Sequence, residues 1–273
     1  MRDPEIQPIG RSYLFVPGNR PERFAKACGA GADAVIVDLE DAVPAAEKAG
    51  ARAALAAWLS PAQPVLVRIN GAETEWFRDD LELCKTPGVA VIVLPKAEGI
   101  DHLKSIEEQV GRGTLILPLI ETARGLWNAL ELAQARNVRR LVFGSIDFQL
   151  DLAMQADEDE LLCFRSQLVL ASRVAGIDAP VDGVSTALDD PEQLRADTLR
   201  ARRLGFGGKL CIHPKQVAHV NECFRPGADE VAWAKRVLDA ASAAKGAAVA
   251  VDGKMVDRPV ILKAQAILSE AER

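Results

Sequence analysis

Short runs of apolar and often β-branched residues recur along the chain. Eight such runs stand out, at residues 12–17, 34–40, 64–70, 89–96, 115–121, 140–145, 179–185 and 207–214. They are nearly continuous in apolar character, which is typical of parallel strands whose outer face is covered by helices. The pattern therefore predicts eight parallel strands.

Segments with helical spacing lie between these runs. The clearest are residues 47–59, 74–85, 125–136, 160–176 and 191–205. Eight strands that alternate with helices predict an α/β protein, a (β/α)8 TIM barrel, over residues 11–228. An open doubly wound sheet is the alternative, but no GxGxxG motif follows the first strand to support it.

The chain continues beyond what eight strand–helix units need. Residues 229–273 contain a helical segment, an apolar stretch that leads to an Asp-Gly turn signal at Asp252, and a final helix that begins near Pro259. We expect these residues to form a C-terminal helical extension. Asp257 directly precedes the last helix, so its plainest role is to cap that helix.

Composition narrows the range of partners. The 273 residues carry a net charge of −6 and no lysine or arginine run longer than two residues, which argues against a nucleic-acid partner. No apolar stretch is long enough to span a bilayer, and the polar, proline-broken start is unlike a signal peptide. The five cysteines are odd in number and form no CxxC pair, so we expect a reducing, cytoplasmic environment.

Ionisable residues gather where the predicted strands end. In a TIM barrel, the carboxyl ends of the strands form the rim that carries the active site. Charges on such a rim, above apolar walls, are costly unless they pair with each other or bind a ligand. The residues at these ends are Asp38, Glu40, Arg68, Asn70, Lys96, Glu121, Asp147, Asp182 and His213.

Glu121 and Asp147 follow adjacent strands, so their carboxylates can meet at one point. Two carboxylates, with water and substrate oxygens in the remaining positions, suit Mg²⁺. Arg68 would face them from the third strand, where a guanidinium can hold a developing oxyanion. The alternative is structural: Glu121 would pair with Lys96, and Asp147 would cap the helix after the sixth strand.

Eight short motifs follow one another along the chain: LFVPGNRPERFAKA, DLEDAV, VRIN, LPKAE, IETARG, FGSIDF, GKLCIHPKQ and DGKMVD. Together they resemble the citrate lyase β-subunit-like family, which includes malyl-CoA and citramalyl-CoA lyases. The resemblance spans about residues 11–270. It implies a (β/α)8 barrel, a Mg²⁺ site, assembly of trimeric type, and reversible carbon–carbon cleavage of a 3-hydroxyacyl thioester that bears carboxylates.

The resemblance also implies roles for individual residues. Glu121 and Asp147 resemble metal ligands, and Arg68 resembles the residue that holds the substrate carbonyl or enolate oxygen. Asp257 is similar to an aspartate that transfers a proton in the site of the neighbouring subunit, on which the C-terminal extension would pack in a homotrimer or dimer of trimers. The other positions are the CoA contacts Phe15, Arg20 and Lys26 and the substrate wall at Ile146, Ile212 and His213.

The carboxylates Asp38, Glu40 and Asp41 lie on the same rim, apart from the resemblance. We expect them to hydrogen-bond to metal-bound waters. The alternatives are that they are further metal ligands, or that Asp41 caps the helix near Pro44.

One position departs from the family pattern. In FQLDLAM, Ala153 stands where relatives often have glycine. This change would alter the lid after the sixth strand, and with it the size of substrate that the site accepts.

The main hypothesis is a Mg²⁺-dependent lyase that uses reverse Claisen chemistry. It would cleave a malyl-, citramalyl- or citryl-CoA type of thioester into an acyl-CoA, such as acetyl-CoA, and a 2-oxoacid. Three alternatives stay open: a CoA-independent class II 2-oxoacid aldolase, a malyl-CoA thioesterase, and a non-catalytic subunit of a larger lyase complex. The complete rim of ionisable residues argues against the last of these.

Overall fold

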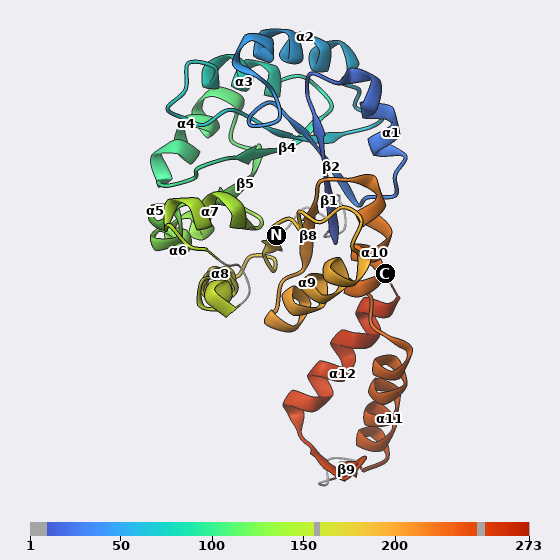
Figure 1. The fold of residues 1–273 in the computed structure, drawn as a ribbon. Helices are drawn as coiled ribbons and strands as arrows, with labels where there is room; N and C mark the ends of the chain where they lie inside the picture. The colour runs from blue at the N-terminus through green and yellow to red at the C-terminus, as the bar shows by residue number, and fades with distance from the viewer. Residues whose placement is uncertain (1–9, 156–158, 245–248, 273) are drawn as a thin grey trace. The chain divides into compact units, whose positions relative to one another are not determined.

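In this computed structural model, eight parallel strands close into a barrel in chain order. Figure 1 shows the strands at the centre of the barrel with helices around them. The structure describes residues 10–155, 159–244 and 249–272. The strands of the barrel are β1 (Ser12–Pro17), β2 (Ala34–Asp38), β3 (Val65–Arg68), β4 (Val89–Leu94), β5 (Leu115–Ile120), β6 (Val142–Phe143), β7 (Val181–Asp182) and β8 (Gly208–Cys211). The predicted (β/α)8 barrel is therefore confirmed.

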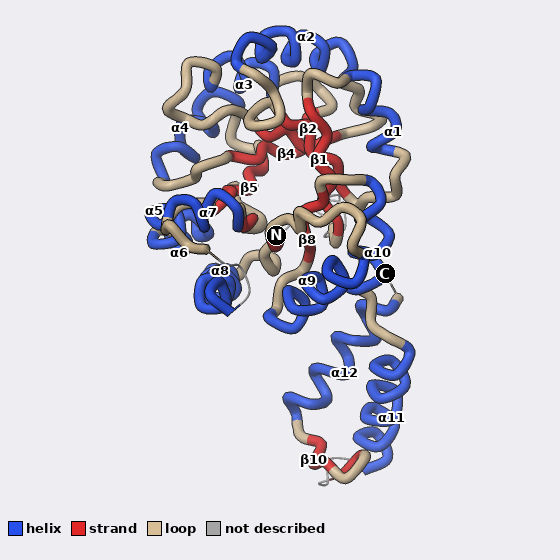
Figure 2. Tube along the Cα trace, viewed as in Figure 1, coloured by secondary structure: helices blue, strands red, loops and turns tan. Residues whose placement is uncertain are grey.

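Helices form the outer layer around these strands (Figure 2). They are α1 (Phe24–Cys28), α2 (Lys48–Trp58), α3 (Phe77–Cys84), α4 (Ile100–Val110), α5 (Ala123–Trp127), α6 (Ala129–Gln134), α7 (Ser145–Asp151), α8 (Leu162–Ala175), α9 (Pro191–Leu204) and α10 (Pro214–Phe224). Short 3₁₀ turns stand at η1 (Pro21–Arg23), η2 (Ala45–Glu47) and η3 (Asp159–Leu161).

The structure differs from the expected elements in two places. The single helix expected over residues 125–136 is two helices, because Asn128 turns its side chain to the carbonyl of Glu98 at 2.7 Å and separates α5 from α6. Strands β6 and β7 are shorter than the apolar runs that predicted them. The residues that follow each of these two strands line the rim of the barrel instead.

The barrel interior is a packed apolar core to which every strand contributes. Its buried members are Tyr13, Ile36, Leu66, Val93, Leu117, Leu119, Val142, Val181 and Leu210. Because these side chains fill the barrel as a solid core, ligands are confined to its rim.

Arg140 is buried among backbone oxygens from three parts of the barrel. Its guanidinium donates to the carbonyl oxygens of Gly10 at 2.7 Å and Ala179 at 2.6 Å, and to the Tyr13 hydroxyl at 2.8 Å. These residues precede or begin their strands, so Arg140 ties together the end of the barrel opposite the rim. Carbonyl groups that strand pairing leaves open there are satisfied by one side chain.

The chain divides into two compact units, residues 1–221 and 222–273, with the boundary inside α10. The second unit contains α11 (Ala228–Ala244), an antiparallel hairpin of β9 (Val249–Val251) and β10 (Lys254–Val256), and α12 (Arg258–Ala271). Asp252 and Gly253 form the hairpin turn with φ angles of 51° and 74°, the left-handed geometry that an Asp-Gly pair favours. Asp257 caps α12 through a 3.2 Å hydrogen bond from the Val260 N–H.

None of the helices in the described part of the chain is long and apolar enough to cross a membrane. The expectation about a signal peptide concerns residues 1–9, which lie outside the described residues.

We expect Arg140→Met to lower the free energy of unfolding by about 2–4 kcal/mol, because it leaves several buried carbonyl oxygens without a donor. Denaturant unfolding followed by circular dichroism measures this change. The matched control is Arg139→Met, which removes a partly exposed ion pair with Asp178 and should cost about 1 kcal/mol or less. Equal losses in the two variants would contradict the role given to Arg140.

Candidate active site

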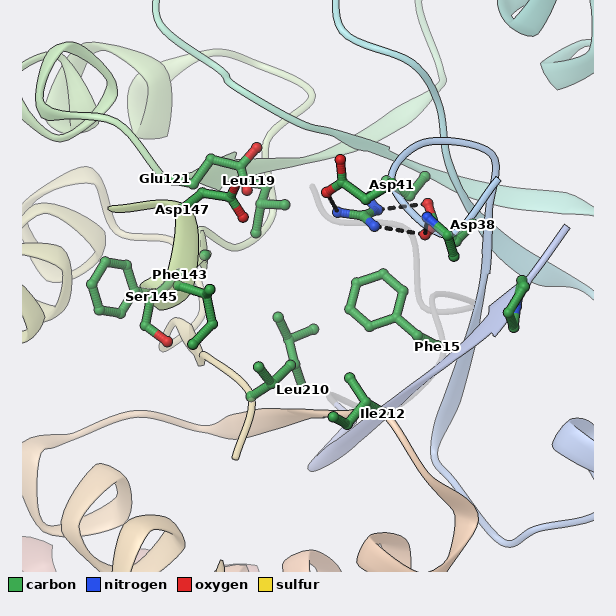
Figure 3. A pocket seen from close by; sticks show the side chains of 16 residues that line it. Phe15, Asp38, Asp41, Leu119, Glu121, Phe143, Ser145, Asp147, Leu210 and Ile212 are labelled. Atoms are coloured by element: carbon green, nitrogen blue, oxygen red, sulfur yellow. Dashed lines mark hydrogen bonds and ion pairs between the residues drawn. The ribbon is translucent and has the colours of Figure 1, made fainter. Parts of the chain in front are cut away.

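A cavity of about 380 Å³ lies at the carboxyl ends of the strands (Figure 3). Every strand except β4 contributes a lining residue, either from its last positions or from the loop that follows. The predicted site residues on this lining are Phe15, Asp38, Asp41, Arg68, Glu121, Ile146, Asp147 and Ile212. The tertiary structure thus brings these eight predicted site residues to one cavity, and four of them, Asp38, Arg68, Glu121 and Asp147, belong to the nine named at the strand ends.

Arg68, the last residue of β3, is buried against a carboxylate of the neighbouring strand. Its Nε and Nη2 atoms donate to the two oxygens of Asp38 at 2.7 and 2.6 Å, which is the two-point contact between guanidinium and carboxylate. Asp38 also accepts the backbone N–H groups of Glu40 and Ala42 at 2.9 and 3.0 Å. We expected Asp38 to hydrogen-bond to metal-bound waters, but its two oxygens instead accept hydrogen bonds from Arg68 and from the loop after β2. Asp38 therefore orients Arg68 and shapes that loop.

Two further carboxylates reach the same guanidinium. Nη1 of Arg68 lies 2.9 Å from Glu40 Oε2 and donates to Asp41 at 3.2 Å, and the Phe15 ring lies 4.9 Å from the guanidinium carbon. Burial alone would lower the pKa of Arg68, but the surrounding carboxylates, Asp38 first, outweigh it and raise that pKa. Nε and Nη2 donate to Asp38, and Nη1 faces both Glu40 and Asp41, so one N–H group, on Nη2, can be offered to an oxygen of a ligand.

Glu121 directly follows β5 and is 1% exposed. Its Oε1 accepts the backbone N–H of Lys96 at 2.8 Å. Gly144 lies directly against the Glu121 side chain. A Cβ atom added to Gly144 would lie 2.5 Å from the Glu121 Cβ and 2.6 Å from its Oε2, which is too close. Only glycine at position 144 leaves room for this carboxylate at the cavity wall.

The buried Glu121 carboxylate has a high affinity for protons. Burial, reinforced by the negative charge of Glu40, raises its pKa to about 8, and Asp147 acts in the same direction. Figure 3 shows the Glu121 and Asp147 side chains next to each other on one wall of the cavity, with Asp38 and Asp41 across from them. A carboxylate in such a position gains from a bound cation.

Lys96 connects the two acidic walls. Its backbone N–H holds Glu121, whereas its ammonium donates to Glu40 at 2.7 Å. The φ angle of Lys96 is 46°, a left-handed conformation that is uncommon outside glycine and is often found at functional sites. The structural alternative in which the Lys96 ammonium pairs with Glu121 is therefore wrong.

Asp147 lies in the first turn of α7, and the structure gives it no capping bond, since the cap position is Gly144. The alternative role as a helix cap is thus not what the structure shows. No group of three or more His, Cys, Asp or Glu residues within the described ranges is arranged to hold a metal ion, so Glu121 and Asp147 form a two-carboxylate donor set.

A second cavity, of about 610 Å³, shares Phe15, Pro17 and Ile212 with the first. Its basic lining is provided by Arg23, Lys26, His213 and Lys215. Lys26 lines this cavity, as expected for a CoA contact. Arg20 does not line it: its side chain is half-exposed, and its Nη1 lies 4.0 Å from Glu22 Oε1. Arg23 lines the cavity instead. Arg23 and Lys215 are functional candidates that the sequence analysis missed, because a lone basic residue in a helical pattern carries no signal.

The backbone N–H groups of Ile212 and His213 are not available to a ligand. Both N–H groups donate to Gln216 Oε1, at 2.8 and 3.3 Å. The side chain of Ile212 lines the first cavity, so the contribution of this segment to the wall is apolar. Asp182, which also appeared among the strand ends, is fully buried and bonds to Arg165 on α8 at 3.0 Å, outside this cavity.

Ala153 follows α7 with a φ angle of 53°. This is the left-handed region, where a Cβ atom is unfavourable and glycine is preferred. The departure from the family pattern at this position is thus an alanine in a glycine-type conformation.

The fold and the site together define a (β/α)8 barrel with a carboxylate pair and a buried arginine on its rim, an arrangement typical of metal-dependent enzymes. The model of the HpcH/HpaI aldolase/citrate lyase family matches residues 11–214, and the chain belongs to this family. The resemblance found in the sequence motifs is therefore confirmed.

Individual relatives are similar over almost their whole length. A citrate lyase subunit beta-like protein of Deinococcus radiodurans is 40% identical and covers 95% of this chain and 96% of its own. A (3S)-malyl-CoA thioesterase of Cereibacter sphaeroides is 36% identical, with 96% and 94% covered. The crystal structure of protein CitE from Mycobacterium tuberculosis with magnesium, acetoacetate and coenzyme A gives a TM-score of 0.87 at 36% identity, covering 97% of this chain and 98% of that chain.

The raised pKa of Glu121 predicts a pH-dependent stability of the metal-free protein. The folded-state pKa of about 8 lies above the ordinary value of 4.5, so the folded state binds this proton more tightly than the unfolded chain does. The stabilisation is complete below the ordinary pKa and is lost as the pH rises through the folded-state value. Between about pH 5 and pH 8, Glu121 should lower the free energy of unfolding by up to about 1.4 kcal/mol per pH unit.

Denaturant unfolding at several pH values, with a chelator present, measures this dependence. Glu121→Gln should flatten the slope, whereas Glu82→Gln, at an exposed glutamate, should leave it unchanged. If the slope of Glu121→Gln equals that of the wild-type protein, the carboxyl of Glu121 does not carry the dependence.

Proposed function

We propose that this protein is a Mg²⁺-dependent carbon–carbon lyase. It cleaves a 3-hydroxyacyl-CoA thioester that bears carboxylates into an acyl-CoA and a 2-oxoacid. The observation that carries the proposal is the pair Glu121 and Asp147 in one cavity with the buried Arg68. Support also comes from the CitE structure that holds magnesium, acetoacetate and coenzyme A.

The donor set fits Mg²⁺. This ion prefers oxygen ligands and keeps several waters, so it needs only one or two carboxylates from the protein. Glu121 and Asp147 supply two. The pKa of Glu121 is raised first by burial and then by the negative charge of Glu40 and Asp147, and a divalent cation would offset that charge. When bound there, Mg²⁺ supplies a Lewis acid for the substrate oxygen that becomes the ketone of the 2-oxoacid.

Arg68 stabilises the enolate that forms from the thioester part of the substrate. When the carbon–carbon bond breaks, its electron pair passes into the thioester carbonyl, whose oxygen becomes an enolate oxygen. The N–H group of Arg68 Nη2 that no protein carboxylate takes donates to this oxygen, and the two-point contact with Asp38 holds the guanidinium plane in place. The substrate hydroxyl loses its proton as its oxygen becomes the carbonyl oxygen of the 2-oxoacid, and the enolate carbon gains one, so the protons balance. We assign the delivery of the proton to the enolate carbon to Asp257 of a neighbouring subunit in a homotrimer.

The basic cavity next to the site suits the CoA part of the substrate. Arg23, Lys26 and Lys215 line it, and the thioester would pass into the first cavity beside Phe15, which lines both. An acidic protein that binds phosphate groups needs such a local concentration of positive charge. None of the five cysteines, all of which lie within the described residues, forms a disulfide, which agrees with a cytoplasmic location.

Thioester hydrolysis is the second candidate, because a 36% identical relative is named a (3S)-malyl-CoA thioesterase. The two reactions give different products. Lyase chemistry on malyl-CoA yields acetyl-CoA and glyoxylate, whereas hydrolysis yields malate and free CoA.

The experiment that tests the function is a product analysis by mass. Malyl-, citramalyl- and citryl-CoA are each incubated with the protein and MgCl₂, and we expect an acyl-CoA plus a 2-oxoacid from at least one of them. Glu121→Gln and Asp147→Asn keep the side-chain shape but remove charge, so each should lower turnover by roughly a thousandfold and weaken Mg²⁺ binding. Asp178→Asn, at the opposite end of the barrel, is the control and should keep its activity. Near-normal turnover of either site variant at limiting Mg²⁺ would remove that residue from the metal site.

Arg68→Lys keeps the charge but loses the planar fork that contacts Asp38. We expect turnover to fall by about a hundredfold while KM changes little, because the enolate oxygen becomes charged only late in the reaction. Steady-state kinetics separate the two parameters, with Arg139→Lys as a control at another ion-paired arginine. Weaker substrate binding with unchanged turnover would show that Arg68 acts on the ground state alone.

The assignment of Asp257 to a neighbouring site is tested by mixing two inactive variants, Arg68→Ala and Asp257→Ala, while subunits exchange. If Asp257 acts in trans, some sites of a mixed trimer combine an intact Arg68 with an intact Asp257, so activity returns to roughly a quarter of the wild-type level or less. Native mass spectrometry confirms the exchange. A mixture that has exchanged its subunits and stays inactive would show that Asp257 acts within its own chain or in helix capping only.

A further inference from the structure

Lys48, the first residue of α2, is buried behind the loop that follows β2. It is 6% exposed, and it is not among the described residues that line the first or the second cavity. Its Nζ atom donates to the carbonyl oxygens of Leu39 at 2.8 Å and Glu40 at 3.0 Å. The ammonium thus contacts the loop that carries the carboxylates around Arg68, yet it has no place in the reaction proposed above.

The surroundings of this ammonium are built for directed contacts. An ammonium has three N–H groups. Two of them donate to the carbonyls of Leu39 and Glu40, and Nζ also lies over the Trp76 ring, 4.9 Å from its centroid. Burial lowers the pKa of Lys48, and the charges of Asp38 and Asp80 oppose that shift. An apolar side chain would pack here without the cost of burying a charge, so the hydrogen bonds are what this lysine adds.

The peptide between Leu39 and Glu40 is held at both of its polar groups. This peptide is trans, so its C=O and N–H groups point in opposite directions. Its C=O accepts from Lys48, whereas its N–H, which belongs to Glu40, donates to Asp38 Oδ1 at 2.9 Å. Lys48 on one side and Asp38 on the other therefore fix the plane of this peptide.

Asp38 connects this peptide to Arg68. The Oδ1 atom that accepts the Glu40 N–H also accepts Arg68 Nε at 2.7 Å, and Oδ2 accepts Nη2 at 2.6 Å. If the peptide turned over, its carbonyl oxygen would face the Asp38 carboxylate and the two would repel each other. The carboxylate would then move, and the guanidinium that it holds would move with it.

We propose that Lys48 is a positioning residue for Arg68. It keeps the Leu39–Glu40 peptide in one orientation, and through this peptide and Asp38 it holds the guanidinium plane that receives the enolate oxygen. The role in turnover rests on the proposed lyase function. The metal wall does not depend on Lys48, because Glu121 is held by the backbone N–H of Lys96.

Lys48→Met removes the donor and keeps an unbranched side chain. We expect kcat to fall by about tenfold, with KM and the Kd of Mg²⁺ changed by less than about twofold, because a misaligned guanidinium is felt in the transition state. Steady-state kinetics use the CoA thioester that the wild-type protein cleaves fastest. Lys85→Met, at an exposed lysine that pairs with Glu82, is the control and should keep the wild-type kcat. An unchanged kcat in Lys48→Met would overturn the proposal.

A double-mutant cycle separates positioning from a general loss of structure. In an Arg68→Lys background the planar fork is absent, so Lys48→Met should lower kcat further by less than about twofold. An equal loss in both backgrounds would show that Lys48 does not act through Arg68. Lys48→Gln keeps an N–H donor and should recover about threefold of kcat relative to Lys48→Met, and no recovery would overturn the hydrogen-bonding role. If Lys48→Met does not fold, Lys48→Gln takes its place in the cycle.

A measurement without substrate separates this inference from the function. Hydrogen exchange observed by NMR follows the Nε–H of Arg68 and the amide N–H of Glu40, both of which donate to Asp38. Lys48→Met should speed the exchange of the Arg68 Nε–H by at least about tenfold, and Lys85→Met should leave it unchanged. If no thioester is cleaved but this exchange accelerates, the lyase function fails and the structural link from Lys48 to Arg68 stands. If the exchange is unchanged in a folded Lys48→Met protein, the inference is wrong.

Discussion

The contact between Arg68 and Asp38 is the interaction on which the rest of the candidate site depends. These residues end two neighbouring strands, so the barrel itself places a guanidinium against a carboxylate. Asp38 also holds two backbone N–H groups of the following loop, which presents Glu40 and Asp41 to the same arginine. A buried charge of this kind is tolerable only when it is paired, and here the pairing also fixes the plane of the guanidinium.

From this pair, a continuous set of contacts extends to the opposite wall. Glu40 bridges Arg68 and the Lys96 ammonium, and the backbone of Lys96 holds Glu121. The unusual conformation of Lys96 lets one residue serve both walls, and Gly144 provides the space for Glu121. Acidic groups outnumber basic ones along this path. The excess negative charge lies where the proposed function requires a divalent cation.

The sequence predicted the barrel because periodicity is a local property. Nearly continuous apolar runs between helical segments arise wherever parallel strands are covered by helices, and all eight strands lie within the predicted ranges. Predictions were weaker where a single side chain decides the local structure. Asn128 breaks a helix that the pattern shows as continuous, and β6 and β7 end early because their following residues line the rim. The partner of Asn128 is Glu98, 30 positions away. A contact at that separation does not change the hydrophobic periodicity from which helices and strands are predicted.

For the site, the sequence by itself determined which residue types stand at the strand ends, since the carboxyl ends of parallel strands meet at one rim. It also determined the family, because ordered motifs are a property of the chain. The tertiary structure decided which of those groups pair. The Lys96 ammonium bonds to Glu40, which is 56 positions away, whereas Glu121 accepts the Lys96 backbone N–H. The N–H groups of Ile212 and His213, after β8, donate to Gln216. The physical reason is that a hydrogen bond or ion pair is chosen by distance and burial within the closed barrel, and spacing along the chain carries neither.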